Sequence, residues 1–328
     1  MSLEPRITRR SVLPVLGALP LSLRAQLSSG THPATRILFG GDVMLSRYVG
    51  KLAREKKDPA WPLRDLAPLL AGADIAFVNL ESPFSDRGKP VEEGMLFKAE
   101  PEMIAGLELA GIDIVSTANN HARDRDAYGV DYTLDLLAQH GILAVGTAKS
   151  AEEVHKGAVL ARNGIRFGFL AYTYDQTNGN RGDRDDRVAM MDPAQMRLDV
   201  AGLKQRADVA IVSMHAGNEY SSKPNAQQKQ FARAAIEAGA SIVVGHHPHV
   251  TQPWEAYGGG AIFYSLGNLV FDQFQRAETQ KGALAEVVFA GTSLTHAAVL
   301  AVDIVRTVPR LITPPASSDL SGGGRKGA

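Results

Sequence analysis

The sequence of 328 residues contains no cysteine. Disulfide bonds and thiolate metal ligands are therefore excluded, and any metal ion must be bound by histidine, amide or carboxylate groups. The chain also lacks an excess of charge, because 35 basic residues balance 35 acidic ones. No run of basic residues provides an electrostatic footprint for nucleic acid, so we expect no nucleic-acid partner.

A long apolar run is missing as well. Residues 12–23 form an apolar stretch that is interrupted by Pro14 and Pro20 and is too short to span a bilayer. This stretch overlaps Thr8-Arg9-Arg10-Ser11-Val12-Leu13, which resembles a twin-arginine box. We therefore expect residues 1–25 to be a twin-arginine-type export signal, with a frayed apolar N-terminus as the alternative. The mature protein would then be periplasmic or secreted, without a membrane span after processing.

Short apolar runs alternate with segments of helical spacing from residue 36 to about 244, and apolar runs dominate after that. This order predicts one α/β domain over residues 36–312, with layered sheets and helices on the outside. Residues 26–35 are polar and contain glycine and proline, which is typical of a linker. Residues 313–328 contain a Ser/Gly run that predicts a disordered tail.

Three histidines lie within four positions in the segment Gly245-His246-His247-Pro248-His249. The segment follows the apolar run 242–244, which predicts the end of a buried strand, and open α/β sheets bind ligands at that end. Imidazole is a common metal ligand near neutral pH, so we interpret the segment as part of a metal site. A polar loop whose histidines bond to the backbone or to water is the alternative.

Polar residues also follow four other apolar runs, at Asp42, Glu81, Asn119-Asn120-His121 and His215. Each alone has an ordinary explanation, such as a turn residue, a solvated carboxylate or a local cap. If the runs are parallel strands of one sheet, their carboxyl ends lie at one edge and these groups meet there. Carboxylate, amide and imidazole groups suit Zn, Mn or Fe.

Six ordered motifs contain these residues and extend the pattern. They are Gly41-Asp42-Val43-Met44-Leu45, Asn79-Leu80-Glu81, Ala118-Asn119-Asn120-His121, His215-Ala216-Gly217-Asn218-Glu219-Tyr220, Gly245-His246-His247-Pro248-His249-Val250 and Tyr264-Ser265-Leu266-Gly267-Asn268. Between about residue 36 and residue 290 the sequence thereby resembles the CapA family of poly-γ-glutamate capsule biosynthesis proteins. The domain of that family belongs to the calcineurin-like metallophosphatase superfamily, and the resemblance implies a four-layer αββα sandwich.

The resemblance also implies a set of ligands and a catalytic pair. Asp42, Glu81 and His249 would bind one metal ion, and Glu81, Asn120, His215 and His247 would bind the other. His121, next to the ligand Asn120, would be the general acid for a leaving oxygen. His246 would donate a hydrogen bond to a group that binds the metal.

The sequence departs from the superfamily pattern at Met44, where an Asp-x-His motif would supply an imidazole. The first ion then keeps only three ligands. We therefore expect one firmly bound divalent ion (Mn, Zn or Fe) and a second position that is weak or empty. Two smaller departures are Ala216, where the family commonly has Trp, and Asp126, where it commonly has Gly.

Four further residues are candidates for substrate contact, because a metal-bound acyl or phosphoryl oxygen needs donors nearby. They are Arg47, Lys98, Glu219 and Tyr220. A surface or loop position without a role in binding is the alternative for each of them.

These observations favour a metal-dependent hydrolase of phosphoester or amide bonds that uses a metal-activated water and His121 as general acid. Its partner would be poly-γ-glutamate or another γ-glutamyl or phosphoester substrate. Two alternatives stay open. The chain could bind and export a polyanion without catalysis, or it could use His121 for metal-independent proton transfer at a peptide Cα, as a peptide epimerase does.

Overall fold

The computed structural model describes residues 33–174 and 186–312, together with the backbone of 316–319. The predicted export signal and most of the predicted linker lie outside the described residues. Within the segment predicted as a disordered tail, Ala316–Asp319 instead form strand β15, which pairs with a strand of the first sheet. None of the helices in the described residues is long and apolar enough to cross a bilayer.

The first sheet of the described chain has nine strands and combines a parallel half with an antiparallel half. Its strands are β1 (Thr35–Val43), β2 (Ile75–Leu80), β3 (Ile114–Ser116), β4 (Leu143–Val145), β11 (Asn268–Val270), β12 (Lys281–Ala290), β13 (Ser293–Val305), β14 (Val308–Leu311) and β15. β1, β2, β3 and β4 are parallel neighbours in that order. On the other side of β1, strands β12, β13 and β14 continue the sheet in antiparallel order.

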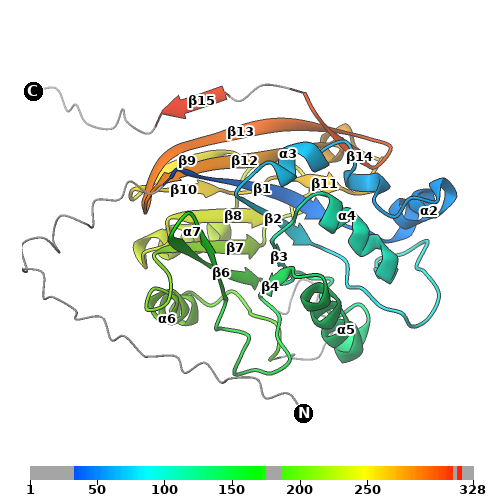
Figure 1. Cartoon of the computed structure of the whole chain (residues 1–328), viewed down its shortest axis with the longest axis horizontal. Coiled ribbons are helices and arrows are strands. Elements are labelled where there is room, and N and C mark those ends of the chain that lie inside the picture. Colours follow the sequence, from blue (N-terminus) through cyan, green and yellow to red (C-terminus); the bar gives the residue numbers. More distant parts are fainter. Residues whose placement is uncertain (1–32, 175–185, 313–315, 320–328) are drawn as a thin grey trace, which may run out of the picture. The chain divides into compact units, whose positions relative to one another are not determined.

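The second sheet has six strands in the order β5-β6-β7-β8-β10-β9. Its strands are β5 (Ala158–Arg162), β6 (Ile165–Thr173), β7 (Val209–His215), β8 (Ile242–His246), β9 (Trp254–Tyr257) and β10 (Gly260–Phe263). The four central strands are parallel, and the outer strands β5 and β9 are antiparallel to their neighbours. The carboxyl ends of β1 and β2 in the first sheet and of β7 and β8 in the second point to the same side of the domain (Figure 1).

Helices cover the outer face of each sheet. The helices on the first sheet are α2 (Arg47–Lys56), α3 (Ala67–Ala71), α4 (Ile104–Leu109) and α5 (Asp126–Gln139), with the 3₁₀ turns η1 (Trp61–Leu63) and η2 (Pro101–Met103). The second sheet carries α6 (Pro193–Leu203) and α7 (Ala226–Glu237). A capping box begins α7, where Asn225 and Gln228 satisfy each other's backbone N–H groups.

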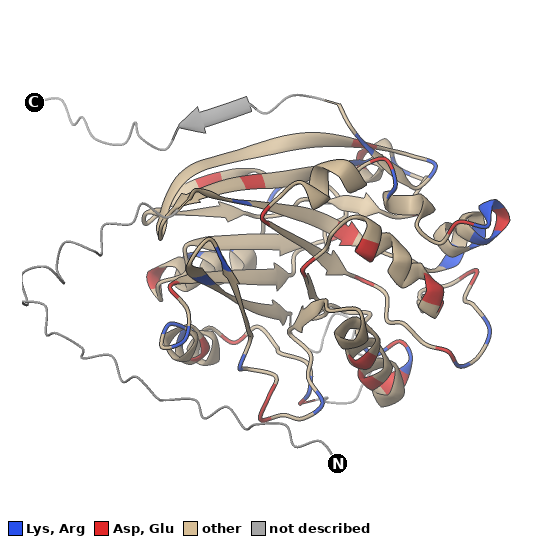
Figure 2. Cartoon of the chain, viewed as in Figure 1, with Lys and Arg blue, Asp and Glu red and all other residues tan. Residues whose placement is uncertain are grey.

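Apolar side chains fill three layers between these elements. The middle layer lies between the two sheets and contains Phe39 and Phe77 from the first sheet and Phe167 and Phe169 from the second. The two outer layers lie between each sheet and its helices. Charged side chains gather on helices and loops, and the strands are largely free of them (Figure 2). The predicted four-layer αββα sandwich is therefore confirmed.

The predicted alternation of strands and helices is present, and the strands without a continuous apolar run are short or lie at sheet edges. β5 and β9 are largely half-exposed, so their residues lack the continuous apolar pattern of a buried strand. β11 has only three residues. β1 extends to Val43, because a bulge carries the strand through Gly40 and Gly41.

Two glycines let one segment of chain approach both sheets at the end that carries the polar motifs. A Cβ on Gly41 would lie 2.0 Å from the backbone oxygen of Gly267, and a Cβ on Gly245 would lie 2.0 Å from that of Tyr264. Each glycine stands directly before a polar motif residue, Asp42 or His246. A side chain at either position would therefore displace a residue that the motifs single out.

We predict that Gly245→Ala lowers the free energy of unfolding by about 1–3 kcal/mol, because the new methyl group would overlap a backbone oxygen. Gly202→Ala is the matched control. Gly202 lies in α6 with nothing within 4 Å of an added Cβ, so this change should raise stability by about 0.5–1 kcal/mol. Urea unfolding midpoints measure both effects. Equal shifts for the two variants would contradict the close approach at Gly245.

Candidate metal centre

Strand ends from both sheets supply the polar residues of one buried cluster. Asp42 lies near the end of β1 and Glu81 directly follows β2, whereas His215 is the last residue of β7 and His247 directly follows β8. The expectation that these groups meet at the edge of a single sheet is therefore wrong. They meet where the parallel strands of two stacked sheets end, and all four residues are at most 3% exposed.

Glu81 stands at the centre of the cluster. Neither of its carboxylate oxygens has a hydrogen-bond partner among the described residues, although both are buried. Oε1 lies 3.7 Å from His249 Nε2 and 3.9 Å from His215 Nε2. Two atoms that each coordinate an ion at about 2.1 Å can be up to about 4.2 Å apart, so these separations leave room for an ion between the groups.

Two overlapping sets of three residues could hold a metal ion, and Glu81 belongs to both. The first set is Asp42, Glu81 and His215, and the second is Glu81, His247 and His249. In each set the ligand atoms lie within 4.8 Å of one another. An unpartnered buried carboxylate inside a ring of imidazoles fits a divalent cation, because it would otherwise carry an uncompensated desolvation cost.

Each of the three imidazoles is held through the ring nitrogen that points away from Glu81. His249 Nδ1 lies 3.0 Å from Asn268 Oδ1, and His215 Nδ1 lies 3.2 Å from Asn79 Nδ2. The hydroxyl of Tyr174 forms a hydrogen bond with His247 Nε2. His249 Nε2 is thereby directed at Glu81, whereas His215 Nε2 lies 2.8 Å from Asn120 Oδ1 and 3.1 Å from His247 Nδ1, so an ion would replace these two contacts.

The backbone of the histidine segment is strained. His247 has φ 94° and His249 has φ 59°, both in the left-handed region that favours glycine. The N–H of His247 donates to Asp42 Oδ2 at 3.2 Å, and His249 Nδ1 lies 3.4 Å from the same oxygen. These contacts hold the strained turn against β1, and backbone strain of this kind is common at functional sites.

Burial lowers the pKa values of the imidazoles, which favours metal binding, and raises that of Glu81, which a bound cation would have to offset. Burial and then the charge of Asp42 raise the pKa of Glu81 well above its usual range. Burial raises the pKa of Asp42 too, but the contacts with His249 and His246 outweigh it, so the pKa stays below its ordinary value. Burial lowers the pKa of His247 to about 3 and that of His246 to about 4, and it lowers the pKa of His215 well below 6.5. These imidazoles are therefore neutral near pH 7, as ligands must be.

His246 lies behind the cluster rather than in it. Both of its ring nitrogens are buried and make no hydrogen bond with the described residues. Nδ1 lies 3.6 Å from Asp42 Oδ1, and the ring stacks against Phe77 in the middle core layer. The predicted hydrogen bond from His246 to a metal-binding group is therefore not formed, although Asp42 lies nearby.

Asn120 and His121 reach the cluster from the loop after β3. Asn120 Oδ1 lies 2.8 Å from His215 Nε2, and His121 Nε2 lies 4.0 Å from Glu81 Oε1. The other ring nitrogen, His121 Nδ1, lies 2.6 Å from Asp124 Oδ2. The ring also stacks on Phe97 at 3.9 Å between ring centres, so two contacts fix its plane.

Met44 lies away from the cluster. Its side chain is fully buried in the outer core layer of the first sheet, and its sulfur accepts a hydrogen bond from the backbone of Ser46 at 3.2 Å. The position of the missing imidazole is thus used for packing. The predicted difference in strength between two ion positions stays a prediction.

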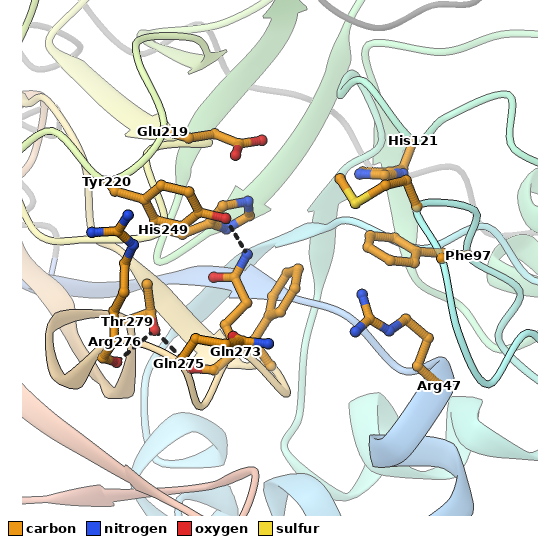
Figure 3. A pocket seen from close by; sticks show the side chains of 13 residues that line it. Arg47, Phe97, His121, Glu219, Tyr220, His249, Gln273, Gln275, Arg276 and Thr279 are labelled. Carbon is orange, nitrogen blue, oxygen red and sulfur yellow. Dashed lines mark hydrogen bonds between the residues drawn. The ribbon is translucent and has the colours of Figure 1, made fainter.

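A cavity of about 350 Å³ opens beside the cluster (Figure 3). Its lining includes Arg47, Glu219 and Tyr220, three of the four residues predicted to contact substrate, together with His121 and His249. These five side chains come from four separate segments of the chain. The cavity therefore joins the predicted general acid and a predicted metal ligand to groups that can bind a substrate.

The fourth residue, Lys98, was predicted to contact substrate, and the structure places it elsewhere. Its side chain is 2% exposed, and the ammonium group donates to Gly88 O at 2.6 Å and to Glu100 Oε1 at 3.0 Å. Lys98 is therefore occupied in holding the loop before η2. Asp126 adopts a left-handed φ of 56°, and this backbone conformation is the reason that the family commonly has glycine at the position. Ala216, the other small departure, is fully buried.

The sequence analysis missed four residues that support the cluster, namely Asn79, Asp124, Tyr174 and Asn268. Asn79 and Asn268 belong to the quoted motifs, so a signal for them was present. Asp124 lies three positions after His121, and this spacing alone does not indicate that the two side chains are in contact. Tyr174 directly follows β6, whose neighbour in the sheet is β7, and only the sheet order shows that it faces His247.

Comparison with known proteins gives a family and a fold. The family model for the bacterial capsule synthesis protein PGA_cap matches residues 36–273. The PGA biosynthesis protein CapA of Bacillus subtilis is 34% identical over 239 residues, covering 72% of this chain and 63% of that protein. The capsule biosynthesis protein CapA of Bacillus anthracis is 31% identical over 242 residues, covering 71% and 59%. The chain thus spans about three fifths of the length of these two relatives.

Two solved structures share the fold at low sequence identity. A hypothetical protein from Thermus thermophilus has a TM-score of 0.52 at 17% identity, covering 81% of this chain and 98% of that one. A phosphatase from Mycoplasma pneumoniae has a TM-score of 0.51 at 12% identity, covering 88% and 95%. Because the family model extends over most of the described domain, including every motif residue of the cluster, the chain belongs to the PGA_cap family of bacterial capsule synthesis proteins.

Proposed function

We propose that this CapA-type chain is an extracytoplasmic, metal-dependent hydrolase that cleaves γ-glutamyl amide bonds or phosphoester bonds. The observation that carries the proposal is the arrangement around Glu81. A buried carboxylate without a hydrogen-bond partner among the described residues is surrounded by imidazole nitrogens, and an oriented histidine faces it from the cavity.

The residues of the cluster would hold Mn, Zn or Fe. Asp42 and Glu81 provide carboxylate oxygens, Asn120 an amide oxygen, and the three histidines provide imidazole nitrogens, which is a donor set that these ions accept. When bound, a divalent ion supplies Lewis acidity that polarises the scissile group and lowers the pKa of a water molecule.

His121 has the geometry of a proton donor to the leaving group. Nδ1 donates to the Asp124 carboxylate, so Nε2 is the ring nitrogen that faces Glu81 and the cavity. Phe97 covers one face of the ring, which keeps Nε2 directed into the site. A donor fixed in this way transfers a proton without first reorienting.

The names of relatives support the substrate class, and the N-terminal sequence supports the location. The Bacillus subtilis relative is called a PGA biosynthesis protein. A Mycobacterium tuberculosis relative, 27% identical over 294 residues, is called a probable polyglutamine synthesis accessory protein. Both names favour a glutamyl polymer over a nucleotide as substrate. The twin-arginine-like box in residues 1–25 supports export across the membrane.

We predict that Glu81→Gln stabilises the metal-free protein by on the order of 1 kcal/mol at pH 7 while it lowers the amount of bound metal. The folded-state pKa of Glu81 is raised, so the folded state binds the proton more tightly than the unfolded state. Protonated Glu81 therefore adds to the free energy of unfolding. This stabilisation is fully present below the unfolded pKa of about 4.3 and is lost as the pH rises through the raised folded pKa. The advantage of the variant should therefore be larger at pH 8 than at pH 5.

Urea unfolding in the presence of a chelator and elemental analysis after reloading with Mn or Zn measure the two effects. Glu108→Gln is the control, because Glu108 is exposed and pairs only with His140 among the described residues. Its stability should change by less than about 0.5 kcal/mol. Full metal content in Glu81→Gln would overturn the assignment of Glu81 as the central ligand.

We predict that His121→Ala lowers kcat by about 10²–10⁴ on a substrate with a poor leaving group, such as a γ-glutamyl alkylamide, and keeps its metal. The loss should be much smaller on a γ-glutamyl nitrophenyl ester, because nitrophenolate leaves without a proton. Asp124→Asn should lower kcat in the same pattern, since it removes the carboxylate that fixes the tautomer of the ring.

Turnover of both substrates, together with phosphodiester analogues, tests these expectations. Equal losses on the two leaving groups would exclude His121 as the proton donor. Polymer binding without turnover of any substrate by the wild type would favour the non-catalytic role in polyanion handling.

A further inference from the structure

Arg47 begins α2 in a backbone conformation that a residue other than glycine rarely adopts. Its φ of 52° lies in the left-handed region, directly after the N-cap residue Ser46. Such a conformation costs free energy and persists only where the surrounding structure enforces it. The side chain of Arg47 is 20% exposed and lines the cavity beside the metal centre. The strained residue is therefore one that brings a cation to the candidate site.

Asp272 holds this start of α2 from a different segment of the chain. Its Oδ2 accepts a hydrogen bond from the backbone N–H of Tyr48 at 3.1 Å and lies 3.4 Å from Nε of Arg47. Asp272 follows β11, and the parallel pairing of β11 with β1 fixes it beside the segment that leads into α2. One carboxylate oxygen thus contacts both the side chain of the strained residue and the backbone next to it.

The pair of Asp272 and Arg47 is costly for the fold. Asp272 is 4% exposed, and its Oδ1 has no hydrogen-bond partner among the described residues. Nε of Arg47 is also buried without a hydrogen bond in that part of the chain. The attraction between two buried charges offsets their desolvation only when the remaining donors and acceptors are satisfied. A costly pair beside a strained backbone and a cavity therefore indicates a functional role.

Phe97 lies between the Arg47 guanidinium and the His121 imidazole on one side of the cavity (Figure 3). The centre of its ring is 5.7 Å from the guanidinium carbon and 3.9 Å from the centre of the imidazole ring. The backbone N–H of Phe97 donates at 2.6 Å to Asp124 Oδ2, the oxygen that His121 Nδ1 also contacts. The cation and the proposed proton donor therefore share one aromatic support, with a buried carboxylate at each end.

We propose that Asp272 is a positioning residue, which fixes Arg47 as the group that stabilises negative charge on the oxygen of the scissile carbonyl or phosphoryl group. Arg47 has no other polar partner in the described part of the chain, so its two terminal nitrogens can donate to that oxygen while Nε stays directed at Asp272. Asp272 does not line the cavity and acts only through Arg47.

This inference rests on the proposed hydrolase function and deepens it. The proposed function places the polarising charge on a metal ion and the proton donor at His121. The geometry adds a fixed cation on the His121 side of the cavity, where negative charge grows as water attacks the scissile group. Because that charge is absent from the ground state, Arg47 should act on kcat more than on KM.

The first test measures kcat and KM of the full-length, metal-loaded protein with a γ-glutamyl alkylamide. We expect Arg47→Met to lower kcat by about 10²–10³ and to leave KM nearly unchanged. Arg47→Lys keeps the charge and loses the planar fork, so it should recover only part of the loss. A raised KM at unchanged kcat would overturn the proposal, because Arg47 would then only bind the ground state.

Asp272→Asn tests the positioning role. It removes the negative charge and keeps an oxygen that can accept from the N–H of Tyr48, so the urea midpoint should stay near that of the wild type. We expect kcat to fall about 10–100-fold, with no further loss when the change is added to Arg47→Met. The full additional loss in the double variant would overturn the coupling. Asp192→Asn is the control, because Asp192 caps α6, does not line the cavity and should leave kcat unchanged.

A binding experiment separates failure of this inference from failure of the hydrolase function. A γ-glutamyl phosphinate carries a negatively charged tetrahedral group in place of the scissile amide, and its binding needs no turnover. Arg47→Met and Asp272→Asn should each weaken phosphinate binding about tenfold or more and leave binding of the alkylamide unchanged.

If the wild type hydrolyses no substrate but shows this difference between the two ligands, the roles of Arg47 and Asp272 stand and the hydrolase function fails. Equal phosphinate affinity in the wild type and both variants would overturn the inference and leave the hydrolase function intact.

Discussion

The structure around the cluster depends on one unfavourable constraint, the burial of the Glu81 carboxylate without a hydrogen-bond partner among the described residues. Burial of a lone carboxylate costs several kcal/mol unless the group is protonated or paired, and Asp42 nearby increases that cost. Both sheets contribute to keeping the group in place. β1 and β2 present the two carboxylates from one side, and β7 and β8 present the imidazoles from the other. The large apolar core between the sheets provides the stability that offsets the local cost.

The neighbours of the cluster fix the positions of its side chains. Each imidazole contacts a residue outside the cluster, namely Asn79, Tyr174 or Asn268, and His215 and His247 also contact each other at 3.1 Å. Gly41 and Gly245 let the segment that carries Asn268 lie against both β1 and β8. The two glycines and the polar residues outside the cluster therefore both hold the carboxylates and imidazoles where a cation would bind.

The sequence predicts much of this arrangement because strand ends are local features. An apolar run followed by Asp42, Glu81, His215 or His247 can be recognised without coordinates. The resemblance to the family then predicts the four-layer αββα sandwich. The sequence does not show which strands are neighbours, since pairing is set by contacts between distant residues. For that reason the division of the cluster between two sheets was not predicted. The role of Lys98 was wrong for a related reason, because its partners Gly88 and Glu100 are ordinary loop residues whose contacts depend on the fold.

Met44 packs in the core at a position where the superfamily pattern has a metal ligand. An imidazole at that position would have to leave the outer core layer, where the buried Met44 side chain packs beneath the helices of the first sheet. The chain thus keeps packing where the wider superfamily pattern has a ligand. His246, held 3.6 Å from Asp42 in the core between the sheets, is the remaining imidazole on that side, and its backbone is part of β8. A shift of His246 toward Asp42 would disturb the end of that strand, so the backbone of β8 keeps His246 in the core between the sheets.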